Sequence, residues 1–259
     1  MTSDDELDVL LRRADNAMDD ALGQIIDADR ALAHVEGAVN RSSELLGSVL
    51  PVYLVCDTSA SMAGEPIAAL NDAIAQVYRL ADHDPLLGEF IRVAVISFNS
   101  TAALVQPLED LRREVPTLTA QGMSNYAGAF TLLHDAIARD LPLFKAEGVR
   151  VFRPTVFFLT DGAPTDRAAD WDSAYERMMQ LVARPNIVAF GFADADAEVL
   201  SRIATTAAFI AEDRTVPLQA ISSYTGSLTQ SIASSARSTD SAQALLVNSN
   251  IPGYVSLPL

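Results

Sequence analysis

The sequence predicts an α/β fold with a doubly wound, mostly parallel sheet of the Rossmann-like kind, one antiparallel edge strand and a long N-terminal helix. From residue 52 onward, apolar segments alternate with amphipathic helical segments, the order of a sheet whose strands are joined by helices. Residues 93–96 and 156–159 are apolar at every position, which is typical of strands that helices cover on both faces. Residues before 50 show a different, helical periodicity.

Residues 1–49 are predicted to contain one long amphipathic helix over 5–45, a stretch without proline. Apolar or small residues there are spaced four and three apart, as in a heptad repeat. These positions are Leu7, Leu11, Ala14, Met18, Ala21, Ile25, Ala28, Leu32, Val35 and Val39. The pattern fits either a helix that packs along its own domain or one that binds a partner or a second copy of the chain.

The α/β domain is expected to span residues 50–235. Its strands are expected at 52–56, 91–98, 101–106, 154–160, 186–192 and 207–210, and its helices at 66–82, 125–139, 168–183, 196–204 and 217–235. Pro66 suits the first turn of a helix. The short turn at Asn99 and Ser100 predicts an antiparallel hairpin at one edge of the sheet.

Residues 236–259 are rich in Ser, Ala and Asn and then carry two prolines and a glycine. We expect a linker and a C-terminal tail, in which residues 251–259 add an extended segment to the domain surface.

The composition excludes several classes of function. A formal net charge of −16 argues against binding nucleic acid or anionic membranes, which need clustered Lys and Arg. Cys56 is the single cysteine, so an internal disulfide and a cysteine-based zinc site are excluded. The acidic N-terminus has no signal-peptide pattern and no apolar run is long enough to span a bilayer, so we expect a cytoplasmic protein.

Side-chain oxygens gather at three predicted loops. Asp57, Ser59 and Ser61 follow the first strand at alternate positions, Ser124 precedes helix 125–139, and Asp161 follows strand 154–160. In a parallel sheet these loops meet at one edge, and hard cations take such oxygen ligands. The sequence therefore predicts a Mg²⁺ site, with Mn²⁺ or Ca²⁺ as alternatives, that leaves at least one coordination position open.

These motifs resemble the von Willebrand factor A domain and its metal-ion-dependent adhesion site (MIDAS). The family pattern is Asp-x-Ser-x-Ser after the first strand, a Thr in a middle loop and Asp-Gly after a later strand. This chain matches the first part at Asp57 and the last at Asp161-Gly162, but it has Ser124 where the family usually has Thr. The resemblance covers about residues 50–235 and implies an interaction module rather than an enzyme. A partner protein would supply a Glu or Asp to the open metal position.

Three residues that flank these loops, Met62, Tyr126 and Thr165, are expected to rim the metal and contact the partner. For Met62 and Tyr126, packing beneath the loop is an equally good interpretation.

Residues 159–166 and 122–130 look like the bacterial cytoplasmic branch related to TerY of tellurium-resistance clusters. That resemblance implies a role in stress response or conflict systems, with protein kinases, metal-dependent phosphatases or AAA+ ATPases as partners.

Enzymatic alternatives find little support in the residues. A haloacid-dehalogenase-like phosphatase would need an Asp where Ser59 stands and a Lys near the site, and Lys145 is the one lysine of the chain. No Gly-x-Ser-x-Gly elbow or Walker loop is present. The remaining alternative is a scaffold that acts, or self-associates, through its N-terminal helix while the metal site is silent.

Overall fold

The computed structural model describes residues 47–79, 85–110, 114–212, 251 and 253–259. The helices expected at 5–45 and at 217–235 lie outside the described residues. Of the helices in the described part, none is both long and apolar enough to cross a membrane.

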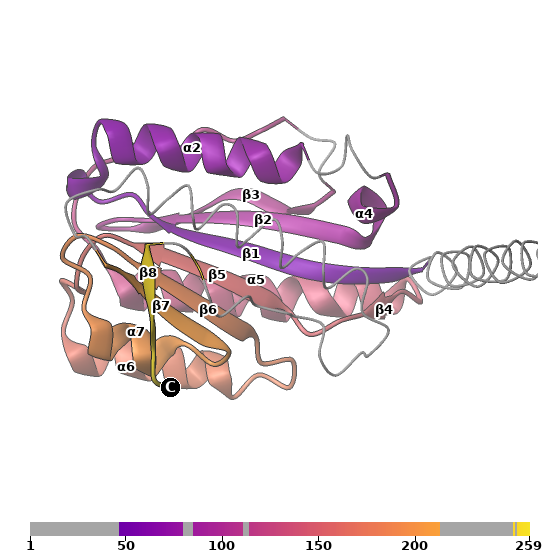
Figure 1. The fold of residues 1–259 in the computed structure, drawn as a ribbon. Coiled ribbons are helices and arrows are strands. Elements are labelled where there is room, and N and C mark those ends of the chain that lie inside the picture. The colour runs from indigo at the N-terminus through magenta and orange to yellow at the C-terminus, as the bar shows by residue number, and fades with distance from the viewer. Residues whose placement is uncertain (1–46, 80–84, 111–113, 213–250, 252) are drawn as a thin grey trace, which may run out of the picture. The chain divides into compact units, whose positions relative to one another are not determined.

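One sheet runs through the described domain in the order β3-β2-β1-β5-β6-β7-β8, and the short β4 pairs with the start of β1 (Figure 1). The strands are β1 (Ser48–Asp57), β2 (Ile91–Phe98), β3 (Ala102–Glu109), β4 (Arg150–Val151), β5 (Thr155–Thr160), β6 (Asn186–Gly191), β7 (Ala207–Ala211) and β8 (Tyr254–Leu257). The five strands from β2 to β7 along this path pair in parallel. The expected α/β class with a mostly parallel sheet is therefore confirmed.

Both edges of the sheet carry an antiparallel strand. β3 pairs with β2 as the expected hairpin. At the other edge β8 pairs with β7, so the C-terminal segment, for which we expected only an extended piece on the surface, supplies the last strand of the sheet. One antiparallel edge was predicted, and the described domain has two.

The described helices are α2 (Glu65–Tyr78), α4 (Pro85–Phe90), α5 (Tyr126–Ala146), α6 (Ala168–Met179) and α7 (Ala197–Ile203). α5 ends at Ala146, well beyond its expected end at 139, and passes through Pro142. Leu141 is buried there, so packing against the core holds the last turns in place despite the proline. α4 and β4 were not predicted, because segments of six and two residues are too short to show a period.

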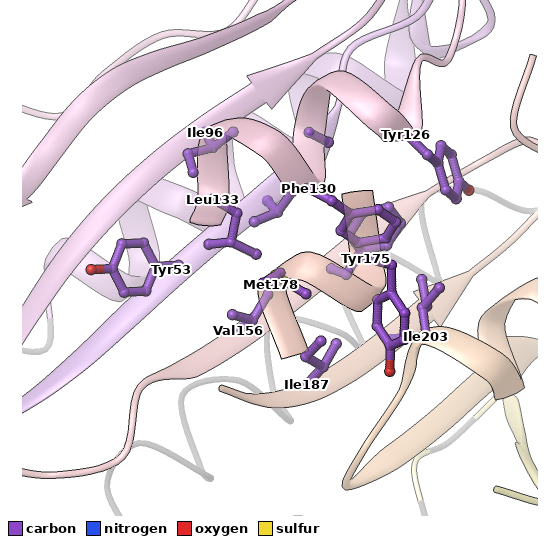
Figure 2. Packing of buried hydrophobic residues seen from close by; sticks show 14 of the residues in the cluster. Tyr53, Ile96, Tyr126, Phe130, Leu133, Val156, Tyr175, Met178, Ile187 and Ile203 are labelled. Carbon is purple, nitrogen blue, oxygen red and sulfur yellow. The ribbon is translucent and has the colours of Figure 1, made fainter. Parts of the chain in front are cut away.

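Side chains of β1 alternate between two cores, because successive residues of a strand point to opposite faces. Leu54 and Cys56 pack with residues of α2 on one face. Tyr53 and Val55 pack with residues of α5, α6 and α7 on the other (Figure 2). Helices thus cover both faces of the sheet, as the continuously apolar strands predicted.

Candidate metal centre

The candidate site lies where the order of the strands reverses. β1 has β2 on one side and β5 on the other. The chain leaves β1 toward α2 on one face of the sheet and leaves β5 toward α6 on the other. The two loops therefore diverge at the carboxyl ends of the strands, the usual place for a ligand in this kind of sheet.

The first loop holds one carboxylate and two hydroxyls. Asp57 is the last residue of β1 and is fully buried. Its Oδ1 accepts a hydrogen bond of 2.8 Å from the backbone N–H of Ser59. Ser59 is extended and precedes a 3₁₀ turn over Ala60–Met62, which brings Ser59 Oγ within 3.0 Å of Ser61 Oγ.

Asp161 follows β5 directly and reaches the same point. Ser59 Oγ donates to Asp161 Oδ1 over 3.4 Å. The Asp161 carbonyl accepts a hydrogen bond of 2.9 Å from the N–H of Asp194, which follows β6. The three oxygen-bearing side chains from the first loop thus meet a second carboxylate that is held by the neighbouring strand connection.

Ser124 lies on a third loop that is joined to the first by backbone hydrogen bonds. Gln121 N–H donates to the Thr58 carbonyl over 2.8 Å, and Ala60 N–H donates to the Gly122 carbonyl over 2.9 Å. Ser124 is only 4% exposed. Its Oγ lies 3.9 Å from the position that a Cβ on Gly162 would take, so the glycine after Asp161 lets the two loops come close.

Gly122 is required by the turn that delivers Ser124. It has φ +75°, and a Cβ there would lie 2.6 Å from Ser100 Oγ. That same Oγ accepts a hydrogen bond from Met123 N–H at 3.1 Å. Since glycine alone adopts this φ without strain and leaves that space open, the conformation of the loop depends on it.

Burial dominates the electrostatics of the two carboxylates. Burial raises the pKa of Asp57 to about 6, against the hydrogen bonds from Thr160 and Ser59, which lower it. Burial likewise raises the pKa of Asp161. Within the described residues, the ion pairs of Lys, Arg and His involve neither carboxylate. A cation from outside would therefore find two buried negative groups without a counter-charge.

The donor set fits a small hard cation. In an octahedral Mg²⁺ site with metal–oxygen distances of about 2.1 Å, neighbouring ligand oxygens lie about 3.0 Å apart. The 3.0 Å between Ser59 Oγ and Ser61 Oγ matches that edge. Among the described residues no group of three His, Cys, Asp or Glu side chains gathers, so a metal here would depend on serine hydroxyls together with Asp57 and Asp161.

The expected rim is corrected at two of its three residues. Met62 is 0% exposed and Tyr126 1% exposed, so neither side chain is at the surface to meet a partner. Met62 belongs to the core on the α2 face, and Tyr126 packs in an aromatic cluster with Phe98 and Phe158. Thr165 is exposed, and its N–H and hydroxyl both donate to the Ser124 carbonyl.

Two residues of the site region have roles that sequence reasoning missed. Thr160, the last residue of β5, donates a hydrogen bond of 2.7 Å to Asp57 Oδ2. The sequence could have indicated this role, because Thr160 stands directly before the predicted metal ligand Asp161. Asp166, which lies two residues before α6, accepts hydrogen bonds from the N–H groups of Tyr126 and Ala127 at the start of α5. Asn125 caps α5, because its Oδ1 accepts a hydrogen bond of 2.9 Å from Gly128 N–H.

Comparison with known proteins gives a family and a fold. The family model for the von Willebrand factor type A domain matches residues 52–223. Among solved structures, the chain is similar to a von Willebrand factor type A protein from Catenulispora acidiphila (16% identity, 70% of this chain and 43% of that chain, TM-score 0.53). It is also similar to the pilus adhesin SpaC from Lactobacillus rhamnosus GG in an open conformation (14% identity, 71% of this chain and 30% of that chain, TM-score 0.56).

A third similar structure is proximal thread matrix protein 1 from the mussel byssus (16% identity, 72% of this chain and 48% of that chain, TM-score 0.50). Another structure of that protein has a zinc-occupied MIDAS motif. The chain spans less than half the length of each of these three chains. No curated protein matches it.

Proposed function

The chain belongs to the von Willebrand factor type A domain family, and from that premise we propose that it is a metal-dependent adaptor. Domains of this family are often interaction modules that bind through a metal. In this chain Ser59, Ser61 and Ser124, with Asp57 and Asp161, would hold one divalent cation, and a Glu or Asp of a partner protein would complete its coordination. The observation that supports this proposal is that two buried carboxylates, Asp57 and Asp161, lie beside the hydroxyls of Ser59 and Ser61, which are 3.0 Å apart. Among the described residues no Lys, Arg or His forms an ion pair with either carboxylate.

The chemistry of the donors explains why such a site would bind an acidic partner. The three serine hydroxyls would ligate the cation directly and are neutral, whereas Asp57 and Asp161 would act through waters bound to it. The inner ligand shell then leaves the cation positive enough to attract a further anion. When bound, the cation would supply a strong positive charge at this edge of the domain. Asp57 is held by two hydrogen bonds from the protein, which fixes its orientation before any ligand arrives.

Mg²⁺ is the proposed cation, with Mn²⁺ and Ca²⁺ as alternatives. Mg²⁺ needs short, nearly octahedral ligands and keeps several waters, whereas Ca²⁺ takes more oxygens at longer distance. The site offers three hydroxyls and two carboxylates, a small protein ligand set that suits Mg²⁺, which completes its shell with waters.

The first test is metal binding by the full chain. We expect isothermal titration calorimetry to detect one Mg²⁺ or Mn²⁺ per chain, and Asp57→Ala to abolish that binding. Asp135→Ala, which removes an exposed carboxylate from α5, is the matched control and should bind as the wild type does. Failure of the wild-type chain to bind any divalent cation would overturn the proposal.

The second test concerns the partner. Co-purification from the native cell in Mg²⁺, followed by elution with EDTA, should release a protein that Asp57→Ala does not capture. A partner that stays bound in EDTA and binds Asp57→Ala equally would contradict a metal-mediated contact.

We also propose that the chain is not an enzyme. Lys145 lies in the last turn of α5, whereas the site adjoins the start of that helix. A helix of this length spans about 30 Å, so the lysine stands far from Asp57. His134 lies within α5 and bonds its neighbour Asp135, so it does not serve the site as a base. A phosphatase assay in Mg²⁺ should give no turnover above that of Asp57→Ala.

The finer role is a proposal that rests on sequence likeness alone. Residues 122–130 and 159–166 support a place in the bacterial, cytoplasmic TerY-like branch, and with it a stress-response or conflict system whose kinases, metal-dependent phosphatases or AAA+ ATPases would provide the partner.

The heptad spacing of residues 1–49 favours a second candidate, a scaffold that works through its N-terminal segment. Deleting residues 1–46, which leaves β1 intact, should then abolish partner capture while Asp57→Ala leaves it intact. The adaptor proposal expects Asp57→Ala to abolish capture.

A further inference from the structure

A buried chain of hydroxyl groups connects the candidate metal site with the start of α5. Thr160 Oγ1 lies 2.7 Å from Asp57 Oδ2. The Tyr126 hydroxyl lies 3.0 Å from Thr160 Oγ1 and 2.9 Å from the Gly162 carbonyl oxygen. Asp57, Thr160 and Tyr126 are each at most 1% exposed, so protein groups rather than bulk water decide how these oxygens are bonded.

The direction of the hydrogen bonds follows from the chemistry of the groups. An ionised carboxylate only accepts, so Thr160 must donate its one proton to Asp57. Thr160 Oγ1 then accepts from the Tyr126 hydroxyl, and also from Gly162 N–H at 3.3 Å. With Asp57 charged, this arrangement satisfies both Asp57 and Thr160; with a neutral group at residue 57, Thr160 can donate instead to the Gly162 carbonyl oxygen, 3.0 Å away.

These hydrogen bonds fix the orientation of the Asp57 carboxylate and connect the three loops. Asp57 Oδ1 is held by Ser59 N–H and Oδ2 by Thr160, so the carboxylate cannot rotate without breaking a buried hydrogen bond. Tyr126 comes two residues after Ser124, and its N–H is capped by Asp166. Displacement of any one loop would therefore disturb the other two.

We propose that Thr160 and Tyr126 are positioning residues of the metal site, which hold Asp57 and the loop after Asp161 in the arrangement that binds the cation. This inference rests on the proposed function. Residues that orient metal ligands typically contribute about 10–100-fold to metal affinity. The loss of either hydroxyl should therefore lower metal affinity in addition to any loss of stability.

The test uses hydroxyl deletions in the full chain. Thr160→Val removes the donor to Asp57 at nearly constant volume, Thr160→Ser restores it, and Tyr126→Phe removes the second hydroxyl while keeping the ring. Tyr53→Phe is the matched control, because the Tyr53 hydroxyl is also buried and donates to a carboxylate, that of Asp140, at 3.1 Å. Figure 2 shows Tyr53 and Tyr126 at opposite ends of the same cluster.

The readouts are Mn²⁺ affinity by calorimetry, the electron paramagnetic resonance spectrum of bound Mn²⁺, and thermal stability in EDTA. We expect Thr160→Val to weaken Mn²⁺ binding about 10–100-fold and Tyr126→Phe about 3–10-fold. Thr160→Ser should restore binding and the wild-type spectrum. Tyr53→Phe should lower the melting temperature as much as Tyr126→Phe does, without changing affinity.

Several outcomes would overturn the inference. It fails if the wild type binds Mn²⁺ and Thr160→Val binds it equally well, and the proposed function survives that result. If Thr160→Val does not fold, wild-type affinity in Tyr126→Phe overturns the inference by itself. A wild-type chain that binds no Mn²⁺ overturns both the inference and the proposed function.

Discussion

Asp57 places a charged carboxylate in a fully buried position, among neighbours that donate hydrogen bonds. Two donors reduce the cost of burying the charge without cancelling it, since the pKa is still raised to about 6. The residue is therefore expected to favour metal binding at the expense of the metal-free fold.

The substitution Asp57→Asn tests whether the charge of Asp57 destabilises the metal-free fold and supports metal binding. Without metal, the amide should stabilise the fold by about 2–3 kcal/mol, the free energy that corresponds to the raised pKa. Thr160 can accommodate the amide by donating instead to the Gly162 carbonyl, 3.0 Å away. In EDTA the variant should melt at a higher temperature than the wild type; in excess Mg²⁺ only the wild type should gain stability. A variant that melts lower in EDTA would contradict the argument.

The pH dependence of the metal-free fold has a definite sign. A carboxyl group whose pKa is higher in the folded state binds its proton more tightly there, so it destabilises the fold as pH rises from about 4 to about 6. The difference in melting temperature between wild type and Asp57→Asn in EDTA should therefore grow over that range and level off above it. A difference that shrinks with rising pH would show that the pKa of Asp57 is lowered. Burial also raises the pKa of Asp161, so the stability of Asp57→Asn should still depend on pH to some extent.

At the scale of elements, the loop from Gln121 to Asn125 depends on Gly122. Gly122→Ala should destabilise the fold by about 1–3 kcal/mol and weaken Mn²⁺ binding, because both its positive φ and the contact with Ser100 resist a side chain. Gly148→Ala is the matched control: that glycine has φ +76° but no atom within 4 Å of the added Cβ. Both variants should lower the melting temperature in EDTA, and only Gly122→Ala should lower affinity. Equal Mn²⁺ affinity in the two variants would show that the conformation of this loop does not affect the metal site.

Strand positions and the loops at their ends were predictable because they depend on local patterns. The apolar runs of β1, β2 and β5 predicted the sheet, and the polar residues at the ends of β1 and β5 indicated Asp57, Ser59, Ser61 and Asp161. The continuation of α5 through Pro142 was not predictable in this way, because tertiary burial of Leu141 overrides a local helix breaker.

Contacts between loops escaped sequence reasoning for a related reason. Asp166 lies two residues before the first residue of α6, Ala168, near the position where local rules favour an Asp as the cap of that helix. It bonds the start of α5 instead, 40 residues earlier in the chain. The burial of Tyr126 and the hydrogen bond from Thr160 to Asp57 likewise depend on which loops meet, and that is decided by the order of the strands.

At the scale of the whole described domain, the candidate metal site and the C-terminal strand β8 lie at different positions along the sheet. β8 is three strands away from β5, a lateral separation of about 14 Å. Tyr254 of β8 packs its ring against Phe190 and Phe209, with ring centroids 5.6 and 6.4 Å away. The site uses neither strand β7 nor β8, so stability and metal affinity should be separable by mutation.

Tyr254→Ala is the substitution that separates them. Removing a buried aromatic side chain typically costs about 3–5 kcal/mol, so in a domain of this size the melting temperature should fall by about 6–20 °C. Val255→Ala, at an exposed position of the same strand, should change it little. Measured well below the melting temperature of the variant, Mn²⁺ affinity should stay within about twofold of the wild type, since an independent site more than 7–10 Å away does not couple strongly. A loss of affinity comparable with that of Thr160→Val would instead mean that the edge of the sheet and the metal loops form one cooperative unit, and that β8 contributes to the site through the strands between them.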